Sequence, residues 1–113
     1  MSTVVFVHAH PDDEALLTSG TMARLSDRGY RVVLIMATDG AAGLTSHEIS
    51  DDQDLAQVRK AELTQSCRVL GVSAFHQLGY ADSGLDGQAP VPGGAIRFAD
   101  TPTELVADQL VSI

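Results

Sequence analysis

Residues 3–14, TVVFVHAHPDDE, decide the fold of this chain. The first five residues of the stretch are almost all apolar and mostly β-branched, which predicts a strand buried on both faces. Residues 15–28 then follow a helical pattern. The polar half of the stretch therefore lies at the carboxyl end of a strand, and in an open α/β sheet ligands bind at that edge.

The next segments extend this pattern to an α/β fold. We expect a helix over residues 13–27 that ends at Arg28-Gly29, and a second apolar strand over residues 31–37. A helix over 51–70 ended by Gly71 and a third strand over 72–78 follow. Strands joined by right-handed helical crossovers predict a Rossmann-like parallel sheet with flanking helices. No glycine-rich dinucleotide fingerprint follows either of the first two strands, so the fold brings no nucleotide with it.

Length and composition limit the classes of protein. With 113 residues the chain forms at most one domain, which we expect to cover residues 1–113. A formal net charge of −8 with seven Lys and Arg residues disfavours nucleic-acid binding. We expect no membrane span and a cytoplasmic location, because no apolar run approaches about 20 residues and no signal-peptide pattern opens the chain. Cys67 is the only cysteine, and we expect a structural thiol on an apolar helix face.

His10 and Asp13 are the predicted metal ligands. They stand three residues apart in a turn that enters a helix, so both side chains can reach one point, and imidazole with carboxylate is a usual ligand pair of catalytic zinc. Asp12 lies between them, and we expect it to take a proton from a water whose pKa the cation lowers to about 7. The alternative is that Asp12 and Asp13 cap the following helix. The buried strand and His10-Pro11 before them favour the metal site.

The run AHPDDE, residues 9–14, resembles the signature of the zinc-dependent N-acetylglucosaminyl deacetylase family, which includes phosphatidylinositol-glycan de-N-acetylases and the mycothiol-pathway deacetylase. Further motifs similar to that family follow in the same order: Thr38-Asp39-Gly40, Arg59 with Glu62, Leu70-Gly71 and the run LGYADSG over residues 78–84. The resemblance implies zinc-dependent hydrolysis of an N-acetyl group on an amino sugar or glucosamine conjugate, with release of acetate. The implied partner is a small-molecule amino sugar.

The resemblance also implies that Arg59 reaches substrate and that Asp82 hydrogen-bonds sugar hydroxyls. An acceptor-only carboxylate on a loop suits the second role. Each residue has a structural alternative, because Arg59 and Glu62 can pair on a helix surface and Asp82 can form a turn before Ser83-Gly84. Asp39 either supports the site or holds its own loop.

The end of the chain suggests an apparently truncated domain. Thr101 is predicted to cap a third helix with Pro102 at its first position, and no strand follows that helix. The resemblance covers almost all of this chain but only about the first half of a typical member, and the His-Pro-Asp-His motif that supplies the family's third zinc ligand has no equivalent here. His8 and His47 are weaker candidates for that ligand. An exposed sheet edge and half-covered apolar faces predict a homo-oligomer.

Two other functions compete with the deacetylase hypothesis. A receiver-like phosphoacceptor signalling domain would use the acidic pair after the first strand to bind magnesium. It also needs an aspartate at the end of its third strand and a lysine at the end of its fifth, whereas the third strand here ends at Gln77-Leu78 and Lys60, the only lysine, lies on the second helix. A non-catalytic sugar-binding remnant would keep Arg59 and Asp82 but lack hydrolytic activity.

Overall fold

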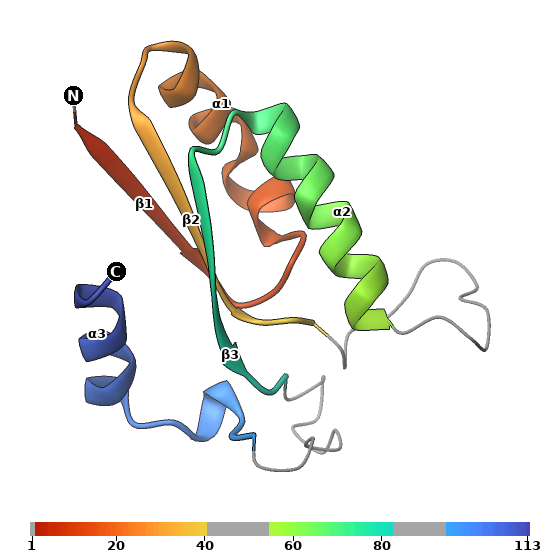
Figure 1. Ribbon diagram of the computed structural model, residues 1–113, viewed down its shortest axis with the longest axis vertical. Helices are drawn as coiled ribbons and strands as arrows, with labels where there is room; N and C mark the ends of the chain where they lie inside the picture. The colour runs from red at the N-terminus through yellow and green to blue at the C-terminus, as the bar shows by residue number, and fades with distance from the viewer. Residues whose placement is uncertain (1, 41–54, 83–94) are drawn as a thin grey trace.

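The computed structural model describes residues 2–40, 55–82 and 95–113. Along the chain its elements are β1 (Thr3–His8), the π-helical turn η1 (Glu14–Thr18), α1 (Ser19–Asp27), β2 (Arg31–Thr38), α2 (Leu55–Leu70), β3 (Ala74–Tyr80), the 3₁₀ turn η2 (Phe98–Asp100) and α3 (Thr103–Val111) (Figure 1). Strands and helices alternate, which confirms the predicted α/β class.

The strands form one parallel sheet in the order β1-β2-β3. The central strand β2 pairs with β1 from Thr3↔Arg31 to His8↔Met36. The helices α1 and α2 lie together on one side of the strands, and α3 lies on the other (Figure 1). Two successive right-handed crossovers in one direction place their helices on the same face, so this layering is the expected one. The carboxyl ends of all three strands consequently share one edge.

The main core lies between the sheet and the helices α1 and α2. It is a cluster of Met22, Val32, Leu34, Met36 and Leu63, none of which is more than 2% exposed. Burying each such side chain contributes about 1.5–3 kcal/mol. Cys67 packs against this cluster, which confirms the expectation of a structural thiol on an apolar helix face.

The helix after β1 is less regular than predicted. It opens with the π-helical turn Glu14–Thr18, and regular α-helix starts only at Ser19. Such turns are rare and occur often at functional sites. The predicted stops are confirmed, because Gly29 and Gly71 have φ of 86° and 73°, which glycine adopts without steric cost. The predicted start of the second helix at residue 51 lies outside the described residues.

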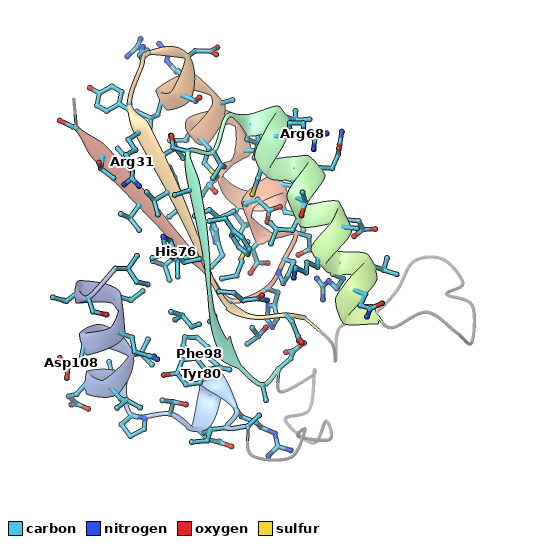
Figure 2. All side chains as sticks on the ribbon, viewed as in Figure 1. Arg31, Arg68, His76, Tyr80, Phe98 and Asp108 are labelled. Atoms are coloured by element: carbon cyan, nitrogen blue, oxygen red, sulfur yellow. The ribbon has the colours of Figure 1, made fainter. Side chains whose placement is uncertain are left out.

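The predicted cap of the third helix is wrong. Pro102 has an extended ψ of 136°, so α3 begins one residue later than predicted and has no side-chain capping bond. The Thr101 hydroxyl instead donates to the carbonyl oxygen of Arg97 at 2.8 Å. Tyr80 links α3 to the sheet, since its hydroxyl donates to Gln109 and its ring lies 5.5 Å from that of Phe98 (Figure 2). Among the described helices, none has the length and hydropathy needed to cross a membrane.

Candidate functional site

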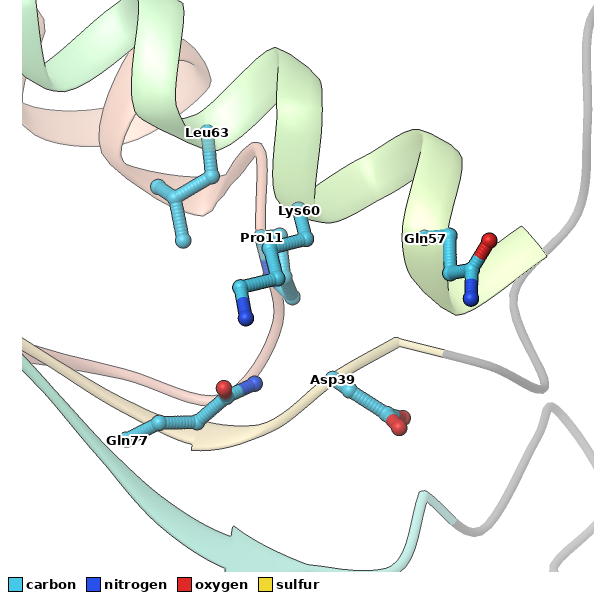
Figure 3. A pocket seen from close by; sticks show the side chains of 6 residues that line it. All are labelled: Pro11, Asp39, Gln57, Lys60, Leu63 and Gln77. Atoms are coloured by element: carbon cyan, nitrogen blue, oxygen red, sulfur yellow. The ribbon is translucent and has the colours of Figure 1, made fainter. Parts of the chain in front are cut away.

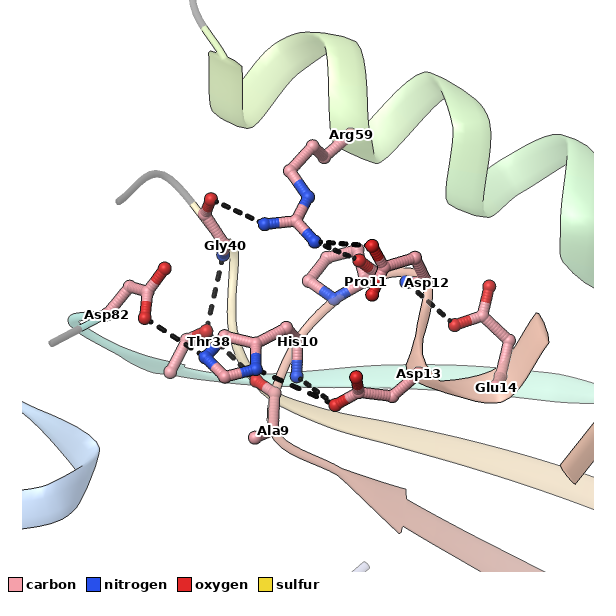
Figure 4. Close-up of polar contacts among 10 residues, drawn as sticks. All are labelled: Ala9, His10, Pro11, Asp12, Asp13, Glu14, Thr38, Gly40, Arg59 and Asp82. Atoms are coloured by element: carbon pink, nitrogen blue, oxygen red, sulfur yellow. Dashed lines mark hydrogen bonds and ion pairs between the residues drawn. The ribbon is translucent and has the colours of Figure 1, made fainter. Parts of the chain in front are cut away.

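The carboxyl edge of the sheet gathers every residue that the sequence predicted for the site. Residues 10–14 follow β1, residues 38–40 end β2, and Asp82 follows β3, while Arg59 extends from α2 toward the same place (Figure 4). We call these residues the polar edge. Parallel strands expose their carboxyl ends on one side, so three segments that are distant in sequence meet here.

His10 and Asp13 place two metal-binding atoms side by side. The Nδ1 atom of His10 lies 3.6 Å from Oδ2 of Asp13, and the same oxygen accepts the His10 backbone N–H at 3.0 Å. Zinc ligands stand roughly 2.1 Å from the metal, so one cation fits between a nitrogen and an oxygen at this separation. In the described part of the chain no group of three His, Cys, Asp or Glu side chains is placed to hold a metal, so the pair is a partial ligand set.

The alternative in which Asp12 and Asp13 cap the helix is wrong. Asp13 occupies the N-cap position of η1 but makes no side-chain capping bond, because its carboxylate turns back to His10. The carboxylate of Asp12 turns to Arg59. Both acidic side chains are thus directed into the polar edge.

Asp12 has a strained backbone. Its φ of 110° is a conformation that L-residues rarely adopt, and among the described residues no other non-glycine has a positive φ. Such a residue costs about 1–3 kcal/mol and persists where neighbours hold it, typically at functional sites. Its N–H donates to Oε2 of Glu14 at 3.0 Å, and Glu14 is only 1% exposed. The Asp12 side chain is 52% exposed, so its carboxylate is accessible to water.

Arg59 ties two loops to α2. Its Nη2 donates to the Pro11 carbonyl at 2.6 Å and to Oδ2 of Asp12 at 2.9 Å, and its Nη1 donates to the Gly40 carbonyl at 2.8 Å. The side chain is 11% exposed. Among the described contacts of Arg59 there is no pair with Glu62, the alternative of an ion pair on the helix surface. Its guanidinium serves acceptors that follow both β1 and β2.

Two further residues, Gly40 and Thr38, have roles in the polar edge that the sequence did not predict. A Cβ atom on Gly40, whose φ is 71°, would lie 2.4 Å from Nη1 of Arg59, so any other residue would displace the guanidinium. The hydroxyl of Thr38 donates to the Ala9 carbonyl at 2.9 Å and accepts the Gly40 N–H at 3.2 Å. The Thr38-Asp39-Gly40 motif was the feature of the sequence that could have indicated both residues.

Asp82 lies beside His10. It is 5% exposed as a residue, and its Oδ1 is 3.1 Å from Nε2 of the imidazole. The turn with Ser83-Gly84, its alternative role, falls outside the described residues. His8 does not join the ligand pair, because its Nε2 lies 2.9 Å from the hydroxyl of Thr18. His47 also lies outside the described residues.

A pocket of about 230 Å³ opens next to the polar edge. Pro11 and Asp39 belong to both the polar edge and the lining of the pocket (Figure 3). The remaining lining residues are Gln57, Lys60, Leu63 and Gln77. Four of the six lining residues are polar or charged, so the pocket offers a small polar molecule several hydrogen-bonding partners. Of the alternatives left open for Asp39, this position is compatible with support of the site.

Cys67 is unsuited to metal binding or nucleophilic attack. Burial raises the pKa of its thiol, and the carboxylate charge of Glu14 raises it further. A thiol must lose its proton to bind metal or attack a substrate, so both effects disfavour such a role.

The comparisons with known proteins define the class to which the fold and the site belong. The family model described as PIG-L, GlcNAc-PI de-N-acetylase, matches residues 5–113. The chain therefore belongs to this family.

Several relatives sharpen that assignment. The 1D-myo-inositol 2-acetamido-2-deoxy-alpha-D-glucopyranoside deacetylase of Thermobifida fusca is 35% identical, over 97% of this chain and 42% of its own length. The diacetylchitobiose deacetylase of Thermococcus kodakarensis is 39% identical over 73% of this chain and 30% of its own. The solved N,N'-diacetylchitobiose deacetylase of Pyrococcus horikoshii has a TM-score of 0.63 and 33% identity over 74% of this chain and 31% of its own. The chain spans less than half the length of these curated relatives, 42% of the first and 30% of the second.

Proposed function

We propose that the protein represented by this chain is a zinc-dependent hydrolase that removes an N-acetyl group from an amino sugar or glucosamine conjugate and releases acetate. The observation that carries the proposal is the adjacent pair His10 and Asp13, with Asp12 between them in sequence, at the carboxyl edge of a sheet of this family. The relatives named as deacetylases of acetamido sugars support the same substrate class.

His10 and Asp13 supply two of the zinc ligands in this proposal. A zinc ion bound there would polarise the acetamide carbonyl and lower the pKa of water to about 7. The donor set suits zinc, because it joins one imidazole and one carboxylate, both of them partly exposed at 39% and 23%. A third ligand comes from outside the described residues.

Asp12 is the proposed general base. Its half-exposed carboxylate takes a proton from water while the water oxygen adds to the acetamide carbon. Cleavage of the carbon–nitrogen bond then releases acetate, and an acid protonates the departing amine. The Asp12 N–H donates to the carboxylate of Glu14, and Arg59 donates to the carboxylate of Asp12; these two hydrogen bonds hold the base in one place.

The substrate contacts of Arg59 and Asp82 stay predictions. Support comes from their position beside the ligand pair and from the neighbouring pocket, where a sugar ring would find Lys60, Gln57 and Gln77 as hydrogen-bonding partners. The predicted cytoplasmic location and the single domain over residues 1–113 are also carried forward as predictions.

Zinc titration tests the core of the proposal. We expect zinc binding by this chain to fall by at least tenfold in His10→Ala and Asp13→Ala, since each change removes one of two donors. The matched control is His8→Ala, because His8 bonds Thr18 and not the ligand pair. Equal zinc affinity in His10→Ala and the parent would refute the assignment. A protein that binds zinc at this pair but, as the complete chain, leaves acetylated amino sugars uncleaved would favour the non-catalytic sugar-binding alternative.

We also propose self-association through β1. Among the described strands β1 pairs only with β2, and its side chains Val5 and Val7 are 51% and 44% exposed. An open strand edge beside an apolar surface favours pairing with another copy. Sedimentation should show a dimer that Val7→Lys weakens. A monomer of the parent chain at high concentration would refute this part of the proposal.

A further inference from the structure

We propose that Asp82 is a positioning residue for His10: it accepts a hydrogen bond from the Nε2–H of the imidazole and so leaves Nδ1 as the atom that binds the metal. The inference rests on the proposed function, because it assumes that His10 is a metal ligand. It differs from the sugar-binding role that the family resemblance implies for Asp82.

The distances on the two sides of the ring determine the tautomer. A neutral imidazole carries one N–H donor and one lone pair. Nε2 stands 3.1 Å from Oδ1 of Asp82, which is hydrogen-bonding distance, whereas Nδ1 stands 3.6 Å from Oδ2 of Asp13, which is too long for a hydrogen bond (Figure 4). The proton therefore belongs on Nε2. The lone pair of Nδ1 is then directed toward the carboxylate of Asp13, where the second proposed ligand lies.

The three side chains differ in their access to water. The Asp82 side chain is 3% exposed, against 39% for His10 and 23% for Asp13. A buried hydrogen bond to a carboxylate is stronger than an exposed one, because little water competes for it. With so little accessible surface, the Asp82 carboxylate is well placed to hold the imidazole of His10.

The backbone next to Asp82 is anchored on both sides. The Ala81 N–H donates to the carbonyl of Ile96 at 2.8 Å, and the Ala81 carbonyl accepts the N–H of Phe98 at 3.1 Å. The carboxylate is therefore presented from a paired segment at the end of β3. It lies 72 residues from His10 in sequence, so β3 and the segment that pairs with it fix the ring of a residue that follows β1.

This arrangement matches a recurring feature of metal sites. A metal-bound histidine usually donates its other N–H to a carboxylate or carbonyl, which fixes the tautomer and raises the basicity of the ligand; removal of that partner typically lowers metal affinity about 10–100-fold. The same loss is expected for Asp82→Ala. Asp82→Asn should be milder, because its amide oxygen can still accept.

Nitrogen NMR of the imidazoles tests the inference before any metal is added. The sequence has four histidines, so their ring signals can be assigned one by one with single His variants. At a pH where the rings are neutral, His10 should show the Nε2–H tautomer in the parent and a mixture of tautomers in Asp82→Ala. The ring of His8 serves as internal control, and Asp108→Asn, an exposed change on α3, is the control variant.

Zinc affinity provides the second measurement. We expect about a 10–100-fold loss in Asp82→Ala and no change in Asp108→Asn. An Nδ1–H tautomer of His10 in the folded parent would overturn the inference whether or not the variants fold. Unchanged zinc affinity in a folded Asp82→Ala would also overturn it while leaving the proposed function intact. Failure of the proposed function looks different, because His10→Ala would then bind zinc as the parent does.

Discussion

The apolar cluster beneath α1 and α2 and the polar edge of the sheet are built from the same strands but are held together differently. The cluster is stabilised by non-directional apolar packing between side chains such as Leu34 and Leu63. The edge depends on directed bonds, a strained residue at Asp12 and a glycine that leaves room for Arg59. The difference indicates that substitutions in the cluster should cost the most stability, whereas substitutions in the edge should cost less stability and also change metal binding and loop order.

The largest loss of stability is expected for Leu34→Ala. Leu34 is fully buried in the centre of β2, and truncation of such a leucine typically costs about 2–5 kcal/mol. Urea unfolding measures the change. Leu16→Ala is the matched control, since Leu16 is 75% exposed and its truncation should change stability by less than about 0.5 kcal/mol. Similar losses in the two variants would break the distinction between cluster and surface.

A pair of glycine substitutions separates backbone strain from crowding at the edge. Gly79→Ala puts a side chain at a φ of 84° with no atom within 4 Å of the new Cβ, so it should lose about 1–2 kcal/mol. Gly40→Ala has the same kind of φ and also displaces the Arg59 guanidinium, so it should lose about 1 kcal/mol more. Urea unfolding measures the loss of stability in both variants. Equal losses would mean that the Arg59 guanidinium moves aside without any loss of stability.

Arg59→Ala should affect the edge more than the whole molecule. It removes the donors that hold the Pro11 and Gly40 carbonyls, for a loss of about 1–2 kcal/mol. The ion pair with Asp12 adds little, since that carboxylate is half exposed. Hydrogen exchange should accelerate at Ala15 and Leu16, whose N–H groups bond to the Asp12 carbonyl. Arg68→Ala, an exposed change on the same helix, should leave that exchange unaltered; equal acceleration in both variants would contradict the role of Arg59.

Local sequence patterns predicted which segments form the sheet, but two details were wrong. The third strand is Ala74–Tyr80, two residues later than the predicted 72–78. The first strand is not buried on both faces, because Val5 and Val7 are 51% and 44% exposed. Apolar β-branched runs predicted β1 and β2, and Gly29 and Gly71 predicted two helix ends, because these signals act over a few residues. The π-helical turn after Asp13 left no such signal. The predicted Thr101 cap failed because the following proline kept the chain extended.

The position of the site was predictable, but its internal contacts were not. Parallel strands place their carboxyl ends on one edge, so the meeting of His10, Asp13 and Asp82 followed from topology alone. The partners of Arg59 and the pairing of Asp82 with His10 join residues 19 to 72 positions apart. Those contacts depend on how α2 and β3 sit against the loop after β1, which no periodicity in the sequence specifies.

Glu14 influences both the polar edge and the apolar cluster. The reactivity of Cys67 measures the influence of the Glu14 charge on the cluster, and this is the smallest effect that we predict. The Glu14 carboxylate holds the Asp12 N–H at the edge, and its charge is the second cause, after burial, of the raised pKa of the Cys67 thiol beside the apolar cluster. Because only the thiolate reacts, alkylation of Cys67 should require a higher pH than alkylation of the unfolded chain. Glu14→Gln should move that pH dependence down part of the way, since burial remains, whereas the exposed change Glu62→Gln should not move it. If Glu14→Gln leaves the profile unchanged, the cluster and the edge are electrostatically separate, and the buried carboxylate serves Asp12 alone.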